Sequence, residues 1–158
     1  MIPLKDGCFA AVNKTAQAGY LSPAEGGRFA PGEAATRAAL WEAFCRVDGQ
    51  TVADVRGWAM DAGVSDGTNG ERAVTRAQMA AMFYRYAGLI GCDMTLRADL
   101  SRFTDAGQIP AYAVDAMSWA VAAGLINGTG TTTISPNGTA TRAQLATILI
   151  RFCEGNVR

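Results

Sequence analysis

Histidine is absent from this sequence, and its absence excludes several classes of function. Without imidazole there is no His-containing catalytic triad, no histidine ligand for a metal and no side chain that ordinarily titrates near neutral pH. Charge is also scarce, because Asp, Glu, Lys and Arg together make up 18% of the residues and sum to a net charge of zero. A protein that binds nucleic acid or an anionic membrane needs a basic surface, so neither partner is expected.

Long apolar runs are missing as well. The longest, residues 113–126, is interrupted by Asp115, Ser118 and Gly124 and is shorter than the roughly 20 residues that cross a bilayer. Residues 1–9 contain no apolar segment followed by a small-residue cleavage site, which predicts either a cytoplasmic protein or a piece of a longer secreted chain. Half of the residues are apolar, and the length suits one globular domain, residues 1–158.

Paired cysteines and paired acids, the usual marks of metal sites and hydrolases, are also lacking. Cys8, Cys45, Cys92 and Cys153 lie far apart without C-x-x-C spacing, which predicts buried or unreactive thiols and neither metal nor cofactor. In an oxidising compartment, Cys8 with Cys45 or Cys92 with Cys153 are alternative pairs. The acids are scattered, and no pair recurs as a glycoside hydrolase requires, so no enzymatic activity is predicted.

What the sequence does contain is the tripeptide Thr-Arg-Ala in three copies, beginning at Thr36, Thr75 and Thr141. Counted from each Thr, apolar residues recur at +4, +7, +8 and +11, the stripe of an amphipathic helix. These positions hold Leu40, Ala43, Phe44 and Val47, then Met79, Met82, Phe83 and Tyr86, then Leu145, Ile148, Leu149 and Phe152. An Arg also recurs at +10 (Arg46, Arg85, Arg151), where the last turn of a helix favours a cation.

Each threonine is well placed to cap its helix. Gln78 and Gln144 complete capping boxes in copies two and three, whereas copy one has Ala39 at that position. The arginine that follows the threonine is placed at the start of the helix, where the helix dipole disfavours a cation by about 0.3–1 kcal/mol. Three such mismatches predict another role, and the unpaired N–H groups of the helix start suggest contact with an anion.

Each copy also has a Gly-rich loop before the threonine and a leading helical segment before that loop. In copy three Tyr112, Ala116, Trp119 and Ala120 fall at helical spacing after Asp105 and Pro110. Copy two has only four positions between Asp54 and Trp58, so its leading helix is predicted to be short, and copy one has Lys14 in place of the Trp. One unit alone cannot bury its stripe, so we predict a nearly all-α fold of units packed on a shared core.

The combined spacing resembles the S-layer homology (SLH) repeat. Copy three carries nearly the whole pattern: Phe103, Asp105, Trp119, Ala120, Gly124, Asn127, Gly128, Pro136, Thr141, Arg142, Ala143 and Gln144. The repeats are placed at about residues 8–49, 50–88 and 103–154, with a connector at 89–102. The resemblance implies three helix-loop-helix repeats in a pseudo-threefold body, with the leading helices forming a central bundle and the loops and second helices arranged around it.

The resemblance also implies a ligand. It is secondary cell-wall polysaccharide, often ending in a pyruvate ketal, bound in grooves between repeats. The residues implied are the T-R-A arginines, the Trp and Asp of the leading segments and a turn glycine: Arg142, Arg76, Arg37, Trp119, Trp58, Asp105, Asp54 and Gly128. An arginine binds a carboxylate bidentately, and a tryptophan offers a sugar an apolar face. The alternatives remain open: pairing of the arginines with Asp54 or Asp105, core packing for Trp58 and Trp119, and helix capping for the two acids.

Two functions follow as hypotheses. The first is a non-catalytic anchor of a larger secreted bacterial surface protein, located at the cell wall and monomeric as an isolated fragment. The second is a protein-binding or assembly module that has kept the scaffold and lost glycan binding, which the incomplete copies one and two would allow. Because the copies differ, we expect unequal grooves, of which one or two bind.

Overall fold

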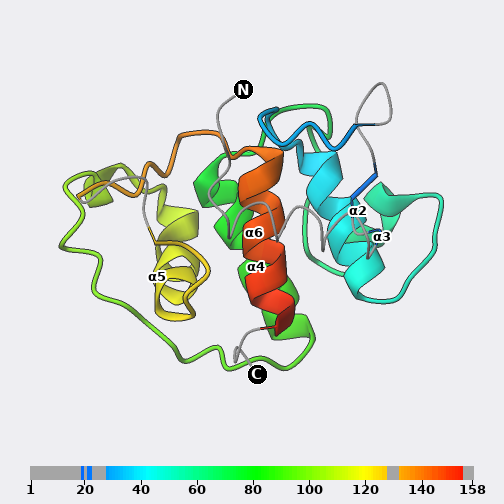
Figure 1. Cartoon of the computed structure of the whole chain (residues 1–158). Helices are drawn as coiled ribbons and strands as arrows, with labels where there is room; N and C mark the ends of the chain where they lie inside the picture. Colours follow the sequence, from blue (N-terminus) through cyan, green and yellow to red (C-terminus); the bar gives the residue numbers. More distant parts are fainter. Residues whose placement is uncertain (1–18, 20, 23–27, 128–131, 155–158) are drawn as a thin grey trace.

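The computed structural model describes residues 19, 21–22, 28–127 and 132–154, and the regular elements within them are helices (Figure 1). Within them there is no β-strand, which confirms the predicted all-α class. In chain order the elements are α2 (Arg37–Val47), α3 (Val55–Asp61), α4 (Arg76–Leu89), the 3-10 turns η2 (Ala106–Gln108) and η3 (Ala111–Ala113), α5 (Val114–Ala122) and α6 (Arg142–Glu154). The predictions for Cys8, Lys14 and Gly128 lie outside the described residues.

The threonines cap the three T-R-A helices α2, α4 and α6 as predicted. The hydroxyl oxygens of Thr36, Thr75 and Thr141 each accept a hydrogen bond of 3.1 Å from the backbone N–H three residues later. The Oε1 atoms of Gln78 and Gln144 in turn accept a 3.0 Å hydrogen bond from the N–H of Thr75 and Thr141, which completes two capping boxes. Such a cap typically contributes about 1 kcal/mol, so the start of each helix is fixed locally by its own sequence.

The apolar stripes of α2, α4 and α6 meet in one aromatic cluster. Phe83 of α4 packs edge-on against Phe44 of α2, with ring centroids 4.7 Å apart, and against Phe152 of α6, at 5.5 Å. Tyr86 lies beside the same two rings, at 5.0 and 5.8 Å. The T-R-A helices therefore converge on this core, and the expectation that the leading helices form the central bundle is wrong for α3 and α5.

The leading helices α3 and α5 lie to either side of α4 and α6 (Figure 1). Each packs against the T-R-A helix that precedes it in the chain, α3 against α2 and α5 against α4. With seven residues, α3 is as short as its spacing predicts. The α5 helix begins only at Val114, so Tyr112 lies in η3, before the helix on which its spacing had placed it.

A closed ring of backbone hydrogen bonds joins the residues just before the three threonines. The N–H of Ala35 donates to the carbonyl of Ala140 at 2.8 Å, that of Ala140 to Val74 at 3.1 Å, and that of Val74 to Ala35 at 2.8 Å. All three residues are fully buried. The ring fixes the starts of α2, α4 and α6 relative to one another, although 105 positions separate Ala35 from Ala140 in the sequence.

In the part of the chain that the structure describes, no helix combines the length and apolar character that a membrane span requires.

Candidate functional site

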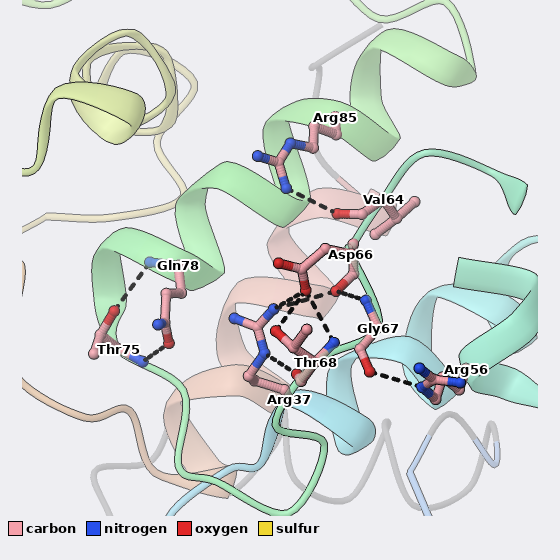
Figure 2. Close-up of polar contacts among 10 residues, drawn as sticks. Arg37, Arg56, Val64, Asp66, Gly67, Thr68, Thr75, Gln78 and Arg85 are labelled. Carbon is pink, nitrogen blue, oxygen red and sulfur yellow. Dashed lines mark hydrogen bonds and ion pairs between the residues drawn. The ribbon is translucent and has the colours of Figure 1, made fainter. Parts of the chain in front are cut away.

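The first element of the candidate site is the contact between the start of α2 and the loop that precedes α4 (Figure 2). The Nε–H of Arg37 donates to the Thr68 carbonyl at 2.8 Å. Its Nη2 lies 3.1 Å from the Asp66 carboxylate and 3.3 Å from the Ser65 hydroxyl. Arg37 is thus paired with a carboxylate, as one interpretation predicted, but the partner is Asp66 and neither Asp54 nor Asp105.

Two further arginines, from two other helices, hold the same loop. Arg56 of α3 donates to the Gly67 carbonyl at 2.7 Å, and Arg85 of α4 donates to the Val64 carbonyl at 3.3 Å (Figure 2). Gly67 has a φ of +77°, and a Cβ there would lie 2.5 Å from the sulfur of Met60. The positive φ favours glycine at this position, and the two arginine bonds hold the loop on either side of Asp66.

Asp66 is held as an anion at the tip of the loop. The backbone N–H and hydroxyl of Thr68 donate to one carboxylate oxygen at 2.9 and 2.7 Å. These hydrogen bonds, with a smaller contribution from the Arg37 guanidinium, lower the pKa of Asp66 below its ordinary value. The Asp66 side chain is 69% exposed, whereas that of Arg37 is only 11% exposed.

These groups line a polar groove of about 300 Å³, at the lower end of the size range of small-molecule sites. One wall is a face of α4, with side chains at spacings of three and four residues. The others are the start of α2, the loop and the η3 turn. The lining residues are Arg37, Asp66, Thr68, Asn69, Gln78, Ala81, Met82, Arg85 and Tyr112. Parts of all three sequence copies therefore meet in one groove.

The other two T-R-A arginines have different surroundings. Arg142 donates from Nε to the Phe29 carbonyl at 2.8 Å and from Nη2 to the Ser22 carbonyl at 2.7 Å, and its guanidinium lies 5.2 Å from the Phe29 ring centroid. Arg76 donates to the side chain of Gln144 at 3.1 Å, and burial lowers its pKa. Within the described residues, Arg37 alone among the three is in an ion pair.

The backbone N–H groups beside these arginines do not serve an anion. In α2 the N–H of Arg37 donates to the Arg72 carbonyl at 3.0 Å, and the next one, of Ala38, donates to Gly70 at 2.9 Å. The third donates to the capping threonine. The helices α4 and α6 repeat this arrangement, so the expectation of unpaired donors at these helix starts is wrong. The equivalent bonds are Arg76 to Gly138, Ala77 to Pro136, Arg142 to Glu33 and Ala143 to Pro31.

The tryptophans lie outside the groove. Trp119 has no exposed surface; its indole N–H donates to the Asp93 carbonyl at 2.9 Å and its ring packs against Tyr84. It has no free face for a sugar, and the structure supports core packing. Trp58 of α3 is partly exposed and lies 6.4 Å from the Tyr86 ring. Trp41 is buried and packs beside Gly70.

The two aspartates of the leading segments do different work. Asp54 caps α3 by accepting a 2.9 Å bond from the N–H of Gly57. Asp105 makes no side-chain cap; its carboxylate accepts the N–H groups of Ile134 at 3.0 Å and Ser135 at 2.8 Å. These bonds lower the pKa of Asp105, with the Ile134 bond contributing most. The capping interpretation of Asp105 is therefore wrong, and the residue anchors the loop that precedes α6.

Two groove residues named from the sequence lie elsewhere than their spacing predicted. Tyr112 was counted as part of a helical stripe, but it precedes α5 and is 57% exposed. Arg85 was expected in the last turn of its helix, yet α4 continues to Leu89 and leaves this arginine at mid-helix, over the groove. The available signal was the position of Tyr112 two residues after Pro110, since proline favours the first turn of a helix and not its interior.

The described cysteines and acids form no metal centre. Cys45 and Cys92 are buried and Cys153 is exposed. Cys92 and Cys153 line a cavity of about 350 Å³ beside Tyr86, whose pKa is raised by burial. Among the described residues there is no group of three or more potential metal ligands. The proposed pairing of Cys92 with Cys153 stays a prediction.

The chain is thus a helical protein whose sequence copies lie side by side, with a polar groove between them. The family model of the S-layer homology domain matches residues 5–40 and 102–146, just over half of the chain. The chain belongs to this family. Comparison with curated proteins gave no match.

Domains of the SLH family are generally non-catalytic modules that anchor proteins to the cell wall, and they occur in surface-anchored cell-wall proteins. The two matched segments cover most of copy three and much of copy one, and they leave out residues 41–101, which contain α3 and α4. The groove is thus built largely from the part of the chain that departs furthest from the family pattern.

Proposed function

We propose that this chain anchors a larger surface protein by binding secondary cell-wall polysaccharide in the groove between α2, α4 and η3. The observation that carries the proposal is the composition of the groove, where an exposed aromatic ring stands beside a set of fixed polar groups. Tyr112 offers an apolar face for the C–H side of a sugar. Thr68, Asn69 and Gln78 supply donors and acceptors for hydroxyl groups, and the arginines suit an acidic substituent such as a pyruvate ketal.

The arrangement we propose for the three repeats is pseudo-threefold. Its support is the repetition of backbone details at equal offsets from the three threonines. The ring of hydrogen bonds links each copy to the next. The residues six before each threonine, Ala30, Asn69 and Ser135, share a positive φ of 50–55°. This arrangement would create one groove at each junction, with linings as unequal as the copies.

Co-sedimentation of the chain with purified bacterial cell walls, before and after removal of the attached polysaccharide, tests the proposal. We expect polysaccharide-dependent binding. The variant Tyr112→Ala should lower the affinity about 3- to 10-fold without changing the Tm, because it removes the sugar platform from an exposed position. The control is Leu89→Ala, which shortens another exposed apolar side chain of the same region that does not line the groove.

Equal binding to walls stripped of polysaccharide would contradict glycan recognition. Retention by protein components of the wall alone would favour the alternative, a protein-binding module on the same scaffold. Unchanged affinity of Tyr112→Ala would exclude this groove as the binding site while leaving the anchoring function in place.

A further inference from the structure

The groove contains two arginines, but they differ in what they have left to offer a ligand. The guanidinium of Arg37 already contacts a carbonyl, a hydroxyl and the Asp66 carboxylate, and its side chain is almost enclosed. An acidic sugar could bind Arg37 only by displacing Asp66, an anion that Thr68 also holds in place. The carboxylate of Asp66 further repels a second negative charge at this end of the groove.

Arg85 is the other cation of the groove, and most of its N–H donors are available to a ligand. A guanidinium has five N–H donors, and the structure gives Arg85 a single hydrogen bond, the 3.3 Å contact with the Val64 carbonyl. Its side chain is exposed, and no carboxylate among the described residues forms an ion pair with it. Two parallel donors therefore remain for a carboxylate, which is the geometry that Arg recognises most strongly.

The neighbours of Arg85 suit the rest of a sugar. Gln78, Ala81 and Met82 share its face of α4 at spacings of seven, four and three residues, and Tyr112 lines the same groove. A ring that contacts Tyr112 would have amide and hydroxyl partners on one side and the guanidinium of Arg85 within the same 300 Å³ space.

We propose that Arg85, and not the T-R-A arginine Arg37, holds the acidic substituent of the wall glycan, so that this groove selects a carboxylate-bearing sugar through the +10 arginine of copy two. The ion pair with Asp66 occupies Arg37, and the negative charge of Asp66 disfavours a second anion there, so the acidic substituent binds Arg85. The inference rests on the proposed function, because it assigns a role within the same groove.

Titration calorimetry of the whole chain with two matched probes tests the assignment. One probe is the methyl glycoside of a pyruvylated N-acetylmannosamine, and the other is its neutral methyl ester. The unmodified chain should bind the acid about 10- to 100-fold more tightly than the ester, the range expected for one charge-assisted bidentate contact. Arg85→Gln should reduce this ratio to about one while its affinity for the ester stays unchanged.

Arg151→Gln is the matched control, because Arg151 holds the same +10 position in α6 and makes the equivalent bond, 3.4 Å, to the Leu125 carbonyl. Arg151→Gln also removes a hydrogen bond between a helix and the turn before it, so it reports any loss of stability that this removal causes. Its acid-to-ester affinity ratio should equal that of the unmodified chain. If Arg85→Gln unfolds, Arg85→Lys keeps the charge without the bidentate fork and should retain an intermediate ratio.

An unchanged ratio in Arg85→Gln would overturn the assignment and leave the proposed function intact, since the acid would then bind elsewhere. An equal loss of affinity for both probes would also overturn it, because Arg85 would then only shape the groove. Absence of binding of either probe to the unmodified chain would contradict the proposed glycan recognition and this assignment together.

Discussion

The starts of α2 and α6 each form a junction with another copy. The two junctions share a pattern of backbone hydrogen bonds and differ in the side chains around them. In both, the N–H groups of the first two helical residues donate to the loop that precedes another T-R-A helix, α4 for α2 and α2 for α6. The arginine Nε–H donates to the carbonyl seven residues before the capping threonine of that other helix, Thr68 or Phe29. At α2 the rest of the guanidinium faces a carboxylate beside an open groove, whereas at α6 it faces a second carbonyl and an aromatic ring.

The difference separates what the repeat needs to fold from what it is free to vary. Apart from the arginine Nε–H, the shared bonds use backbone atoms, which any sequence provides once the threonine and the turn are in place. The second partner of each arginine comes from loop residues such as Asp66, or from Ser22 through its carbonyl, and these lie in segments that differ between copies. Four variants, taken in order of decreasing expected effect, test this comparison.

The largest effect is expected from Phe83→Ala, which should weaken both junctions at once. Phe83 is buried and contacts rings of both α2 and α6, so its removal leaves a cavity at the core that they share. We expect a loss of about 3–5 kcal/mol in the free energy of unfolding, measured by urea denaturation. Leu89→Ala, in the same helix but exposed, should cost less than about 0.5 kcal/mol. A loss below about 1 kcal/mol for Phe83→Ala would mean that the two junctions do not depend on one core.

A smaller effect should distinguish the junctions themselves. Arg142→Ala removes two short bonds to backbone carbonyls and a ring contact, and should cost about 1.5–3 kcal/mol. Arg37→Ala should cost about 1 kcal/mol, because one of its partners, Asp66, is well exposed to water. Urea midpoints of the two variants give the ranking. Equal losses would show that only the shared carbonyl bond matters, and the comparison would then rest on binding alone.

The smallest effect, less than about 1 kcal/mol, is expected from Asp66→Asn, and it carries a pH signature. The pKa of Asp66 is lower in the folded chain than its ordinary value, so its stabilising contribution is present above that ordinary value. The contribution is lost as the pH falls through the lowered value. Unfolding curves measured from about pH 7 to about pH 2 should therefore converge for variant and unmodified chain at the acid end.

Asp61→Asn, which changes another exposed acid, in α3, should shift stability little and without that convergence. A difference between Asp66→Asn and the unmodified chain that persists unchanged at the acid end would exclude the ion pair as its cause.

The sequence was sufficient for features that depend on a single helix. The threonine caps, the capping boxes at Gln78 and Gln144 and the short α3 all follow from spacing, because a helix has a fixed period and fixed unpaired ends. The family was accessible too, since its pattern is a set of spacings that copy three preserves.

Features that depend on contacts between copies were not accessible. The ring through Ala35 and the pairing of Arg37 with Asp66 join residues far apart in the chain, and no local pattern specifies them. The central placement of the leading helices was implied by the family resemblance and not by any pattern in this sequence. Tyr112 was misplaced for a local reason, because its helix starts two residues later than its apolar spacing suggested.

The backbone ring of Ala35, Val74 and Ala140 also limits how many copies can join it. Each of its members gives one N–H and takes one carbonyl bond from a different neighbour, and all are buried. Deleting one copy would leave a buried donor and a buried acceptor without partners, at about 1–3 kcal/mol for each group, and a fourth copy would find no place in a circuit already closed. Main-chain atoms therefore hold the starts of α2, α4 and α6 together, so the loop side chains around them can diverge without changing this arrangement.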